Sequence, residues 1–207
     1  ILKKAKLKLK LLLPKEKNNM IREKLKNQGI GIVIRQGISE NQVNIVYLSI
    51  GSNLGNRKTN IEKAKFLIEN SSMKILKTSS FFETLSWPNK KFPKYINIVL
   101  KIVTNLKPIE LLKNIKKIEK KLGRLSTKKN YPRTCDIDIL DYSRKVINFD
   151  SSHYSLKIPH PRLKNRNFVL IPLFEIDKNW SIPQKKTKIK YLLQKLGTAS
   201  LRSIKQI

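Results

Sequence analysis

The sequence predicts an α/β (α+β) domain in which two helices cover one face of a mainly antiparallel sheet. Some segments are short apolar runs or alternate apolar and polar residues, whereas two others repeat apolar residues at spacings of three and four. These segments follow the order β-α-β-β-α-β between residues 43 and 140. Because this order favours antiparallel pairing with both helices on one face, we expect a ferredoxin-like core with an added C-terminal strand and helix.

The first half of this pattern contains two strands and a helix. Residues 43–50 form an apolar strand, and residues 73–82 are expected to form the second strand. Between them, Thr59 or Asn60 can cap a helix, because both side chains can accept a hydrogen bond from the first turn. The apolar residues of this helix share one face: Ile61, Ala64, Leu67 and Ile68.

The second half begins after a long loop over residues 83–94, which contains two prolines. Residues 95–103 alternate clearly, so Asn97 points away from the apolar face of this strand. Pro108 begins a helix and Gly123 ends it. The remaining expected elements are a basic loop over residues 128–133, strands over 135–140 and 146–149, and a helix over 168–176.

The chain is expected to divide into three parts. A basic N-terminal extension covers residues 1–42, the main domain covers residues 43–183, and a basic tail with at most one short helix covers residues 184–207. Within the extension, we expect strands over residues 6–11 and 32–34 and a helix over residues 18–28.

Charge and composition exclude several classes of protein. The 207 residues include 45 Lys and Arg against 14 Asp and Glu, but only nine of the cations are arginine. We interpret the lysine excess chiefly as a compositional bias on solvated faces, although a net charge of +31 is also typical of nucleic-acid binding. The single cysteine excludes a disulfide framework, and no apolar run reaches the ~18 residues of a membrane helix. We therefore expect a soluble, cytoplasmic protein.

The strongest chemical signal is the pair Asp136 and Asp138. Residues two apart in a strand point to the same face, so their Cα atoms lie ~6–7 Å apart and their carboxylates lie side by side. Like charges this close repel each other, and Mg²⁺ shared with substrate phosphates would relieve the repulsion. An exposed strand face, or pairing with lysines, explains the isolated spacing equally well.

Cations near this pair favour a polyphosphate site. Arg124 and Arg133 precede the two aspartates, and His160 and Arg166 follow them. Two carboxylates among several arginines can hold a metal and absorb phosphate charge in a transition state. Taken alone, His160 is more typical of a surface or structural histidine.

A second group of residues suits a flat heterocycle. Asn97 offers both a donor and an acceptor on the face opposite the apolar residues of its strand. Aromatic side chains occur in the neighbouring segments: Phe81, Phe82, Tyr95 and Phe168. An amide beside aromatic rings can bind a ring with a hydrogen-bonding edge, but taken alone these aromatics are more typical of ordinary core packing.

Five motifs occur in a specific order along residues 43–183. They cover residues 47–57 (YLSIGSNLGNR), 79–84 (SSFFET), 95–97 (YIN), 133–140 (RTCDIDIL) and 159–176, the last of which contains PHPR, NR and FVLIPLFEI. Together they resemble the 6-hydroxymethyl-7,8-dihydropterin pyrophosphokinase family of folate synthesis. The resemblance implies transfer of pyrophosphate from ATP to the hydroxymethyl group of the dihydropterin, with release of AMP.

The resemblance also implies roles for individual residues. Asp136 and Asp138 would hold two Mg²⁺ ions, while Arg124, Arg133 and His160 would be catalytic. The expected ATP-binding residues are Glu119, Arg124, Arg133, Ile139, His160 and Arg166, and the expected pterin-binding residues are Thr84, Leu85, Tyr95, Asn97 and Phe168. It names no general base.

The chain departs from the family pattern at three places. Leu85 stands where the family often has proline, Ser126 replaces a frequent arginine, and Asn130-Tyr131 replaces a common tryptophan-glycine pair. These departures affect loop closure and ATP affinity more than the type of reaction.

The expected partners are ATP and the dihydropterin, without nucleic acid or membrane. We expect a monomer that is fused to, or works beside, a dihydroneopterin aldolase, because residues 1–42 are weakly similar to the end of that enzyme. A basic extension or a leader explains these residues equally well.

Two other functions compete with this interpretation. An RNA-recognition module shares the β-α-β-β-α-β order, but it needs aromatic residues on its central strands. The Asp-x-Asp strand would instead repel phosphate in the absence of a metal. A folate enzyme that has lost its activity and serves as a scaffold is the second alternative.

Overall fold

The computed structural model describes residues 43–124 and 130–207, which belong to one compact unit. The elements expected within residues 1–42, and the departure at Ser126, lie outside these residues. No helix in the described ranges has the length and apolar character needed to cross a bilayer.

A single antiparallel sheet organises the fold. Within the described residues it has six strands in the order β5-β1-β4-β3-β8, with β2 also paired to β4. The strands are β1 (Asn44–Ser52), β2 (Met73–Thr78), β3 (Phe82–Thr84), β4 (Tyr95–Thr104), β5 (Asp136–Tyr142) and β8 (Ile204–Gln206). A small hairpin of β6 (Ile147–Asp150) and β7 (Ser155–Ile158) follows β5.

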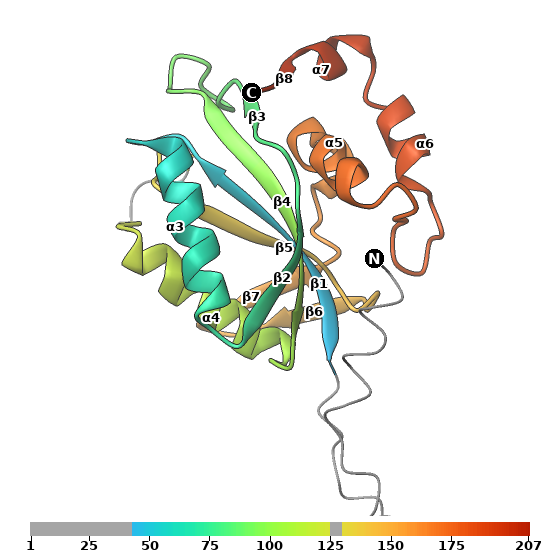
Figure 1. Cartoon of the computed structure of the whole chain (residues 1–207). Helices are drawn as coiled ribbons and strands as arrows, with labels where there is room; N and C mark the ends of the chain where they lie inside the picture. Colours follow the sequence, from blue (N-terminus) through green and yellow to red (C-terminus); the bar gives the residue numbers. More distant parts are fainter. Residues whose placement is uncertain (1–42, 125–129) are drawn as a thin grey trace, which may run out of the picture. The chain divides into compact units, whose positions relative to one another are not determined.

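Helices lie on both sides of this sheet, as Figure 1 shows. One side carries α3 (Arg57–Glu69) and α4 (Pro108–Lys121), and the other carries α5 (Asn167–Ile176), α6 (Ile189–Gln194) and α7 (Thr198–Arg202). A 3₁₀ turn, η1 (Leu163–Asn165), precedes α5. The β1-α3-β2/β3-β4-α4-β5 order, with both intervening helices on one face, confirms the predicted fold class.

Two apolar cores hold these layers together. The first lies between the sheet and α3 and α4, and it includes Leu48, Ile50, Ile61, Ile98, Leu100, Ile115 and Ile137. The second lies between the opposite face and the C-terminal helices, and it includes Tyr47, Val99, Leu140, Leu170, Trp180, Ile189 and Leu192. Residues of the expected tail therefore contribute to the second core.

The caps of the first two helices show how local sequence fixes their ends. The Asn56 side chain accepts a hydrogen bond from the Thr59 amide at 3.1 Å, so α3 begins at Arg57, earlier than predicted. Asn60, one of the two expected caps, instead donates to the Leu54 carbonyl at 2.8 Å. In α4, Pro108 occupies the first turn as predicted.

The predicted strand over residues 73–82 is interrupted at Ser79. The Ser79 hydroxyl accepts a hydrogen bond from the Val99 amide at 2.9 Å, which takes a donor that the strand ladder would otherwise use. The Ser79 amide still donates to the Val99 carbonyl at 3.0 Å, and after this residue the chain leaves the sheet and returns as β3. The tail also differs from the expectation, because it forms α6, α7 and the edge strand β8.

Candidate active site

One row of paired residues crosses the sheet and places the expected metal and pterin residues on the same face. Asp136 in β5 is paired with Gly51 in β1, Gly51 with Asn97 in β4, and Asn97 with Phe82 in β3. Directly paired residues in an antiparallel sheet point to the same side. This side is opposite α3 and α4.

Gly51 gives this row its close spacing. A Cβ atom at this position would lie 2.8 Å from Oδ1 of Asn97 and 3.4 Å from a ring carbon of Tyr95. Any other residue would therefore displace the Asn97 amide, and the glycine of the first motif acquires a specific role in the site.

Arginines hold the first carboxylate. Nη1 of Arg124 lies 2.7 Å from Oδ1 of Asp136, and Nη1 of Arg133 lies 3.3 Å from the same oxygen. The Asp136 side chain is 31% exposed, so it remains open to a ligand. Two guanidinium groups therefore converge on one carboxylate at the edge of the site.

A histidine and a third arginine hold the second carboxylate. Nη1 of Arg166 lies 2.8 Å from Oδ2 of Asp138, and Nε2 of His160 lies 3.7 Å from it. Burial opposes ionisation of Asp138, but the charges of His160 and Arg166 hold its pKa below the usual value. Burial also lowers the pKa of His160; Asp138 opposes this shift, while Arg166 adds to it.

Glu119 connects α4 to β5 and to Arg124. It is 1% exposed and accepts a hydrogen bond from the Ile137 amide at 2.7 Å. It also forms ion pairs with Arg124 and, at 2.8 Å, with Lys116. Its carboxylate is thus fully engaged and orients Arg124.

The side chain of Ile139 does not reach the site face. It is 5% exposed and packs in the core beneath α3 and α4. Its expected contact with ATP would therefore have to come from the backbone or from the strand edge.

The expected pterin-binding residues lie at the same end of the sheet. Nδ2 of Asn97 donates to Oγ1 of Thr84 at 3.1 Å, and both residues are buried. Tyr95 is half-buried, and this burial raises the pKa of its hydroxyl group. The half-buried Phe168 ring lies 5.4 Å from the Arg166 guanidinium, whereas Leu85 is 47% exposed.

Asn53 is a site residue that sequence reasoning missed. Its Oδ1 accepts from the Arg133 amide at 2.8 Å, and its Nδ2 donates to Oγ of Ser86 at 3.1 Å and to the Pro93 carbonyl at 3.3 Å. It therefore links the loop that carries Arg133 to the loop after β3. The only available signal was a polar residue directly after an apolar strand within the first motif.

The donor set fits magnesium that is shared with a nucleotide. Across residues 43–124 and 130–207, no group of three or more His, Cys, Asp or Glu side chains is arranged to hold a metal. Mg²⁺ usually binds through one or two carboxylates together with substrate phosphates and water. Asp136 and Asp138 provide those carboxylates, and the surrounding cations suit the phosphates.

Comparisons with known proteins show which family this chain belongs to. Residues 47–178 match the family model described as 7,8-dihydro-6-hydroxymethylpterin-pyrophosphokinase. A 2-amino-4-hydroxy-6-hydroxymethyldihydropteridine pyrophosphokinase from Aquifex aeolicus is 43% identical over 134 residues, which are 65% of this chain and 81% of that protein. The folic acid synthesis protein fol1 of Pneumocystis carinii is 44% identical over 140 residues, which are 67% of this chain and 18% of that protein.

Solved structures share the fold. A crystal structure of a single-residue variant of Plasmodium falciparum HPPK-DHPS with pteroate superposes with a TM-score of 0.64 at 15% identity, covering 82% of this chain and 47% of that chain. The chain thus spans a small part of the Pneumocystis relative and about half of the Plasmodium chain. Because the family model covers most of this chain, and the Aquifex relative is matched over most of its own length, the chain belongs to the 7,8-dihydro-6-hydroxymethylpterin-pyrophosphokinase family.

Proposed function

We propose that this chain transfers pyrophosphate from ATP to the hydroxymethyl group of 6-hydroxymethyl-7,8-dihydropterin and releases AMP. The observation that carries the proposal is the row from Asp136 through Gly51 to Asn97. It places a cation-rich carboxylate pair beside a buried amide on one face of the sheet. A phosphate donor and a heterocyclic acceptor can therefore bind next to each other.

ATP would bind over the carboxylate pair. Asp136 and Asp138 would hold Mg²⁺, with two ions expected, and the bound ions would neutralise phosphate charge. Arg124, Arg133 and Arg166 now contact these carboxylates and lie where they can contact phosphate oxygens instead. Glu119 and His160 complete this side of the site.

The dihydropterin would bind at the Asn97 end of the row. Asn97 and Thr84 would hydrogen-bond to the edge of the heterocycle, while Tyr95 and Phe168 would pack against its ring. Exposed Leu85 lies next to Thr84 in sequence and would offer backbone or apolar contact. The hydroxymethyl group would then point toward the phosphate side.

The reaction is a single displacement at phosphorus. The hydroxymethyl oxygen attacks the β-phosphorus of ATP, the bond from this phosphorus to the oxygen that bridges to the α-phosphate breaks, and AMP leaves with that oxygen. The hydroxyl proton is released. The arginines stabilise the charge that develops on the phosphate oxygens, so catalysis depends on positioning and electrostatics.

Several expectations stay predictions. They are the monomeric state, the cytoplasmic location, the link to a dihydroneopterin aldolase and the division at residues 42 and 183. Relatives include an Arabidopsis thaliana protein named folate synthesis bifunctional protein, of which this chain covers 26%. That name supports a partnership with another folate enzyme without identifying it.

The decisive experiment measures AMP release from Mg-ATP with and without 6-hydroxymethyl-7,8-dihydropterin. We expect AMP only when the pterin is present, and we expect chelation of the metal to abolish it. If well-folded protein bound neither ligand but bound RNA with strong salt dependence, the RNA-recognition alternative would replace this proposal. Binding of both ligands without turnover would favour the scaffold alternative.

A further inference from the structure

The last residues of the chain lie outside the matched family region and contact the pterin side of the site. The family model ends at residue 178, whereas β8 begins at Ile204. β8 pairs with β3, so Thr84 is opposite Ile204, and the Ile207 amide donates to the Phe81 carbonyl at 3.0 Å. The expected pterin-binding Thr84 therefore lies on a strand held from both sides, by β4 and by β8.

The same segment also holds the first residue of α5. Asn167 is 9% exposed, and its Nδ2 donates to the Ser200 carbonyl at 2.6 Å and to Oγ of Ser203 at 3.0 Å. Its Oδ1 accepts from the Phe168 amide at 2.7 Å. The Ser200 carbonyl and the Phe168 amide fix the orientation of the Asn167 side-chain amide. Asn167 therefore links the C-terminal segment to Phe168, the residue expected to pack on the pterin ring.

A second set of contacts links the end of the chain, the segment before β3 and α5. Nε2 of Gln206 donates to Oγ of Ser80 at 3.0 Å, and the Ser80 hydroxyl donates to Oε1 of Glu175 at 2.6 Å. The Ser80 amide also donates to Oε2 of Glu175 at 3.0 Å. α5 is thereby attached to α7 at its start and to the β3 segment near its end.

We propose that residues 198–207, which we name the C-terminal brace, position the two walls of the pterin site. One wall is β3 with Thr84, and the other is the start of α5 with Phe168. Asn167 is the positioning residue that connects the brace to the second wall. This inference rests on the proposed function and extends it to a segment beyond the matched family region.

The phosphate side depends less on the brace. Arg166 directly precedes Asn167, but its side chain is held by Asp138 at 2.8 Å and its amide donates to the Leu163 carbonyl at 3.3 Å. These contacts remain when Asn167 is shortened. Loss of the Asn167 amide should therefore affect pterin binding more than nucleotide binding.

The test compares Asn167→Ala with the wild type and with Asn179→Ala, the same substitution at an exposed position after α5. Binding of 6-hydroxymethyl-7,8-dihydropterin and of Mg-α,β-methylene-ATP is measured by calorimetry, and Tm by thermal melting. We expect Asn167→Ala to weaken pterin binding about tenfold, as loss of about 1.4 kcal/mol would, and analogue binding less than twofold. Asn179→Ala should change neither affinity.

The variant Asn167→Asp tests whether the Nδ2 donor of Asn167 is the atom that matters. The carboxylate keeps an acceptor for the Phe168 amide but places a second oxygen against the Ser200 carbonyl. It should therefore weaken pterin binding at least as much as Asn167→Ala. Equal losses of both affinities, or no loss of either in the two variants, would overturn the proposal.

Hydrogen exchange of the ligand-free protein separates this inference from the proposed function. In Asn167→Ala, amides of residues 82–84 and 167–170 should exchange faster, whereas those of β1 and β5 should be unchanged. If the wild type failed to bind pterin, the proposed function would be wrong. The hydrogen-exchange comparison would still show whether the C-terminal brace holds residues 82–84 and 167–170. Uniform acceleration across the sheet would indicate general destabilisation and would contradict a brace.

Discussion

The strand β5 carries two kinds of carboxylate that differ in burial and in partners. Asp136 and Asp138 are about one-third exposed and are held by cations at the rim of the site. Asp141, three residues later, is 1% exposed and has no access to solvent ligands. The same residue type in one strand therefore serves an open site at one end and the packed interior at the other.

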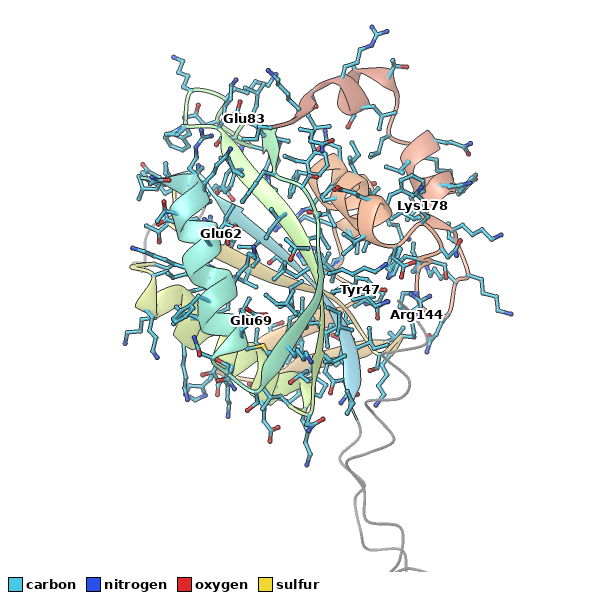
Figure 2. The ribbon with its side chains drawn as sticks, viewed as in Figure 1. Tyr47, Glu62, Glu69, Glu83, Arg144 and Lys178 are labelled. Atoms are coloured by element: carbon cyan, nitrogen blue, oxygen red, sulfur yellow. The ribbon has the colours of Figure 1, made fainter. Side chains whose placement is uncertain are left out.

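Asp141 is enclosed by donors. Its Oδ2 accepts from Nε1 of Trp180 and from Nη1 of Arg144, each at 2.9 Å, and its Oδ1 accepts from the Arg144 amide at 3.0 Å. Figure 2 shows Arg144 and Tyr47 on the side of the sheet opposite α3. The network fixes the segment after α5 to the sheet.

The comparison indicates how a buried carboxylate differs from one that is open to a ligand. Removal of Asp141 would leave the buried Trp180 indole N–H without its acceptor, whereas the Arg144 guanidinium, whose side chain is 46% exposed, could turn to water. The partners of Asp136 and Asp138 are long cationic side chains at a partly exposed face. These side chains can turn from the carboxylates to the phosphate oxygens of a bound nucleotide. Substitutions in the two regions should therefore separate stability from activity.

The largest effect on stability is expected for Asp141→Ala. Leaving a buried donor such as the Trp180 indole N–H unsatisfied typically lowers the free energy of unfolding by about 1–3 kcal/mol. We expect such a loss in urea denaturation, with turnover per folded molecule close to that of the wild type. Asp150→Ala, at an exposed position of β6, is the matched control and should be nearly neutral. A stable Asp141→Ala protein would show that the network contributes little.

Asp138→Ala should have the opposite profile. Loss of an electrostatic group that acts in the transition state typically lowers turnover by about 10²–10³, or about 2.7–4 kcal/mol. The ion pair with Arg166 is partly exposed, so the free energy of unfolding should change by less than about 1 kcal/mol. Steady-state AMP release and urea denaturation measure the two quantities. Retained turnover in Asp138→Ala would exclude this residue as a metal ligand.

The smallest effect concerns Tyr47, beside the Asp141 network. Burial, together with its 2.5 Å hydrogen bond to Oδ2 of Asp177, raises the pKa of Tyr47 above the ordinary value of 10. The folded state thus keeps a proton that the unfolded chain loses, so this stabilisation is complete below pH 10 and falls as pH rises further. Ultraviolet titration should show a late-ionising tyrosine that is absent in Tyr47→Phe. Identical titration curves for the two proteins would contradict the shift.

The main elements could be predicted because their periodicity reflects burial. The alternation around Asn97 and the helical repeat after Pro108 correspond directly to β4 and α4. The side-by-side placement of Asp136 and Asp138 also follows from strand geometry alone. Such features depend on neighbours within the same segment.

Features that depend on distant partners could not be predicted in this way. β5 contains an irregularity where it pairs with Tyr47, and both Leu140 and Asp141 contact the α5 side there. Simple alternation would have put Asp141 on the opposite face. The interruption at Ser79 and the bridging role of Asn53 likewise require knowledge of Val99 and Arg133, which lie 20 and 80 residues away.

Gly51 has a consequence for inhibitor design. Any larger residue there would displace the Asn97 amide, because its Cβ would lie 2.8 Å from Oδ1 of Asn97. A compound that contacts both the Gly51 backbone and the Asn97 amide would therefore bind a surface with little freedom to mutate. A substitution at Gly51 that impaired such a compound would also displace the Asn97 amide, the group proposed to bind the heterocycle, which restricts single-step resistance at this position.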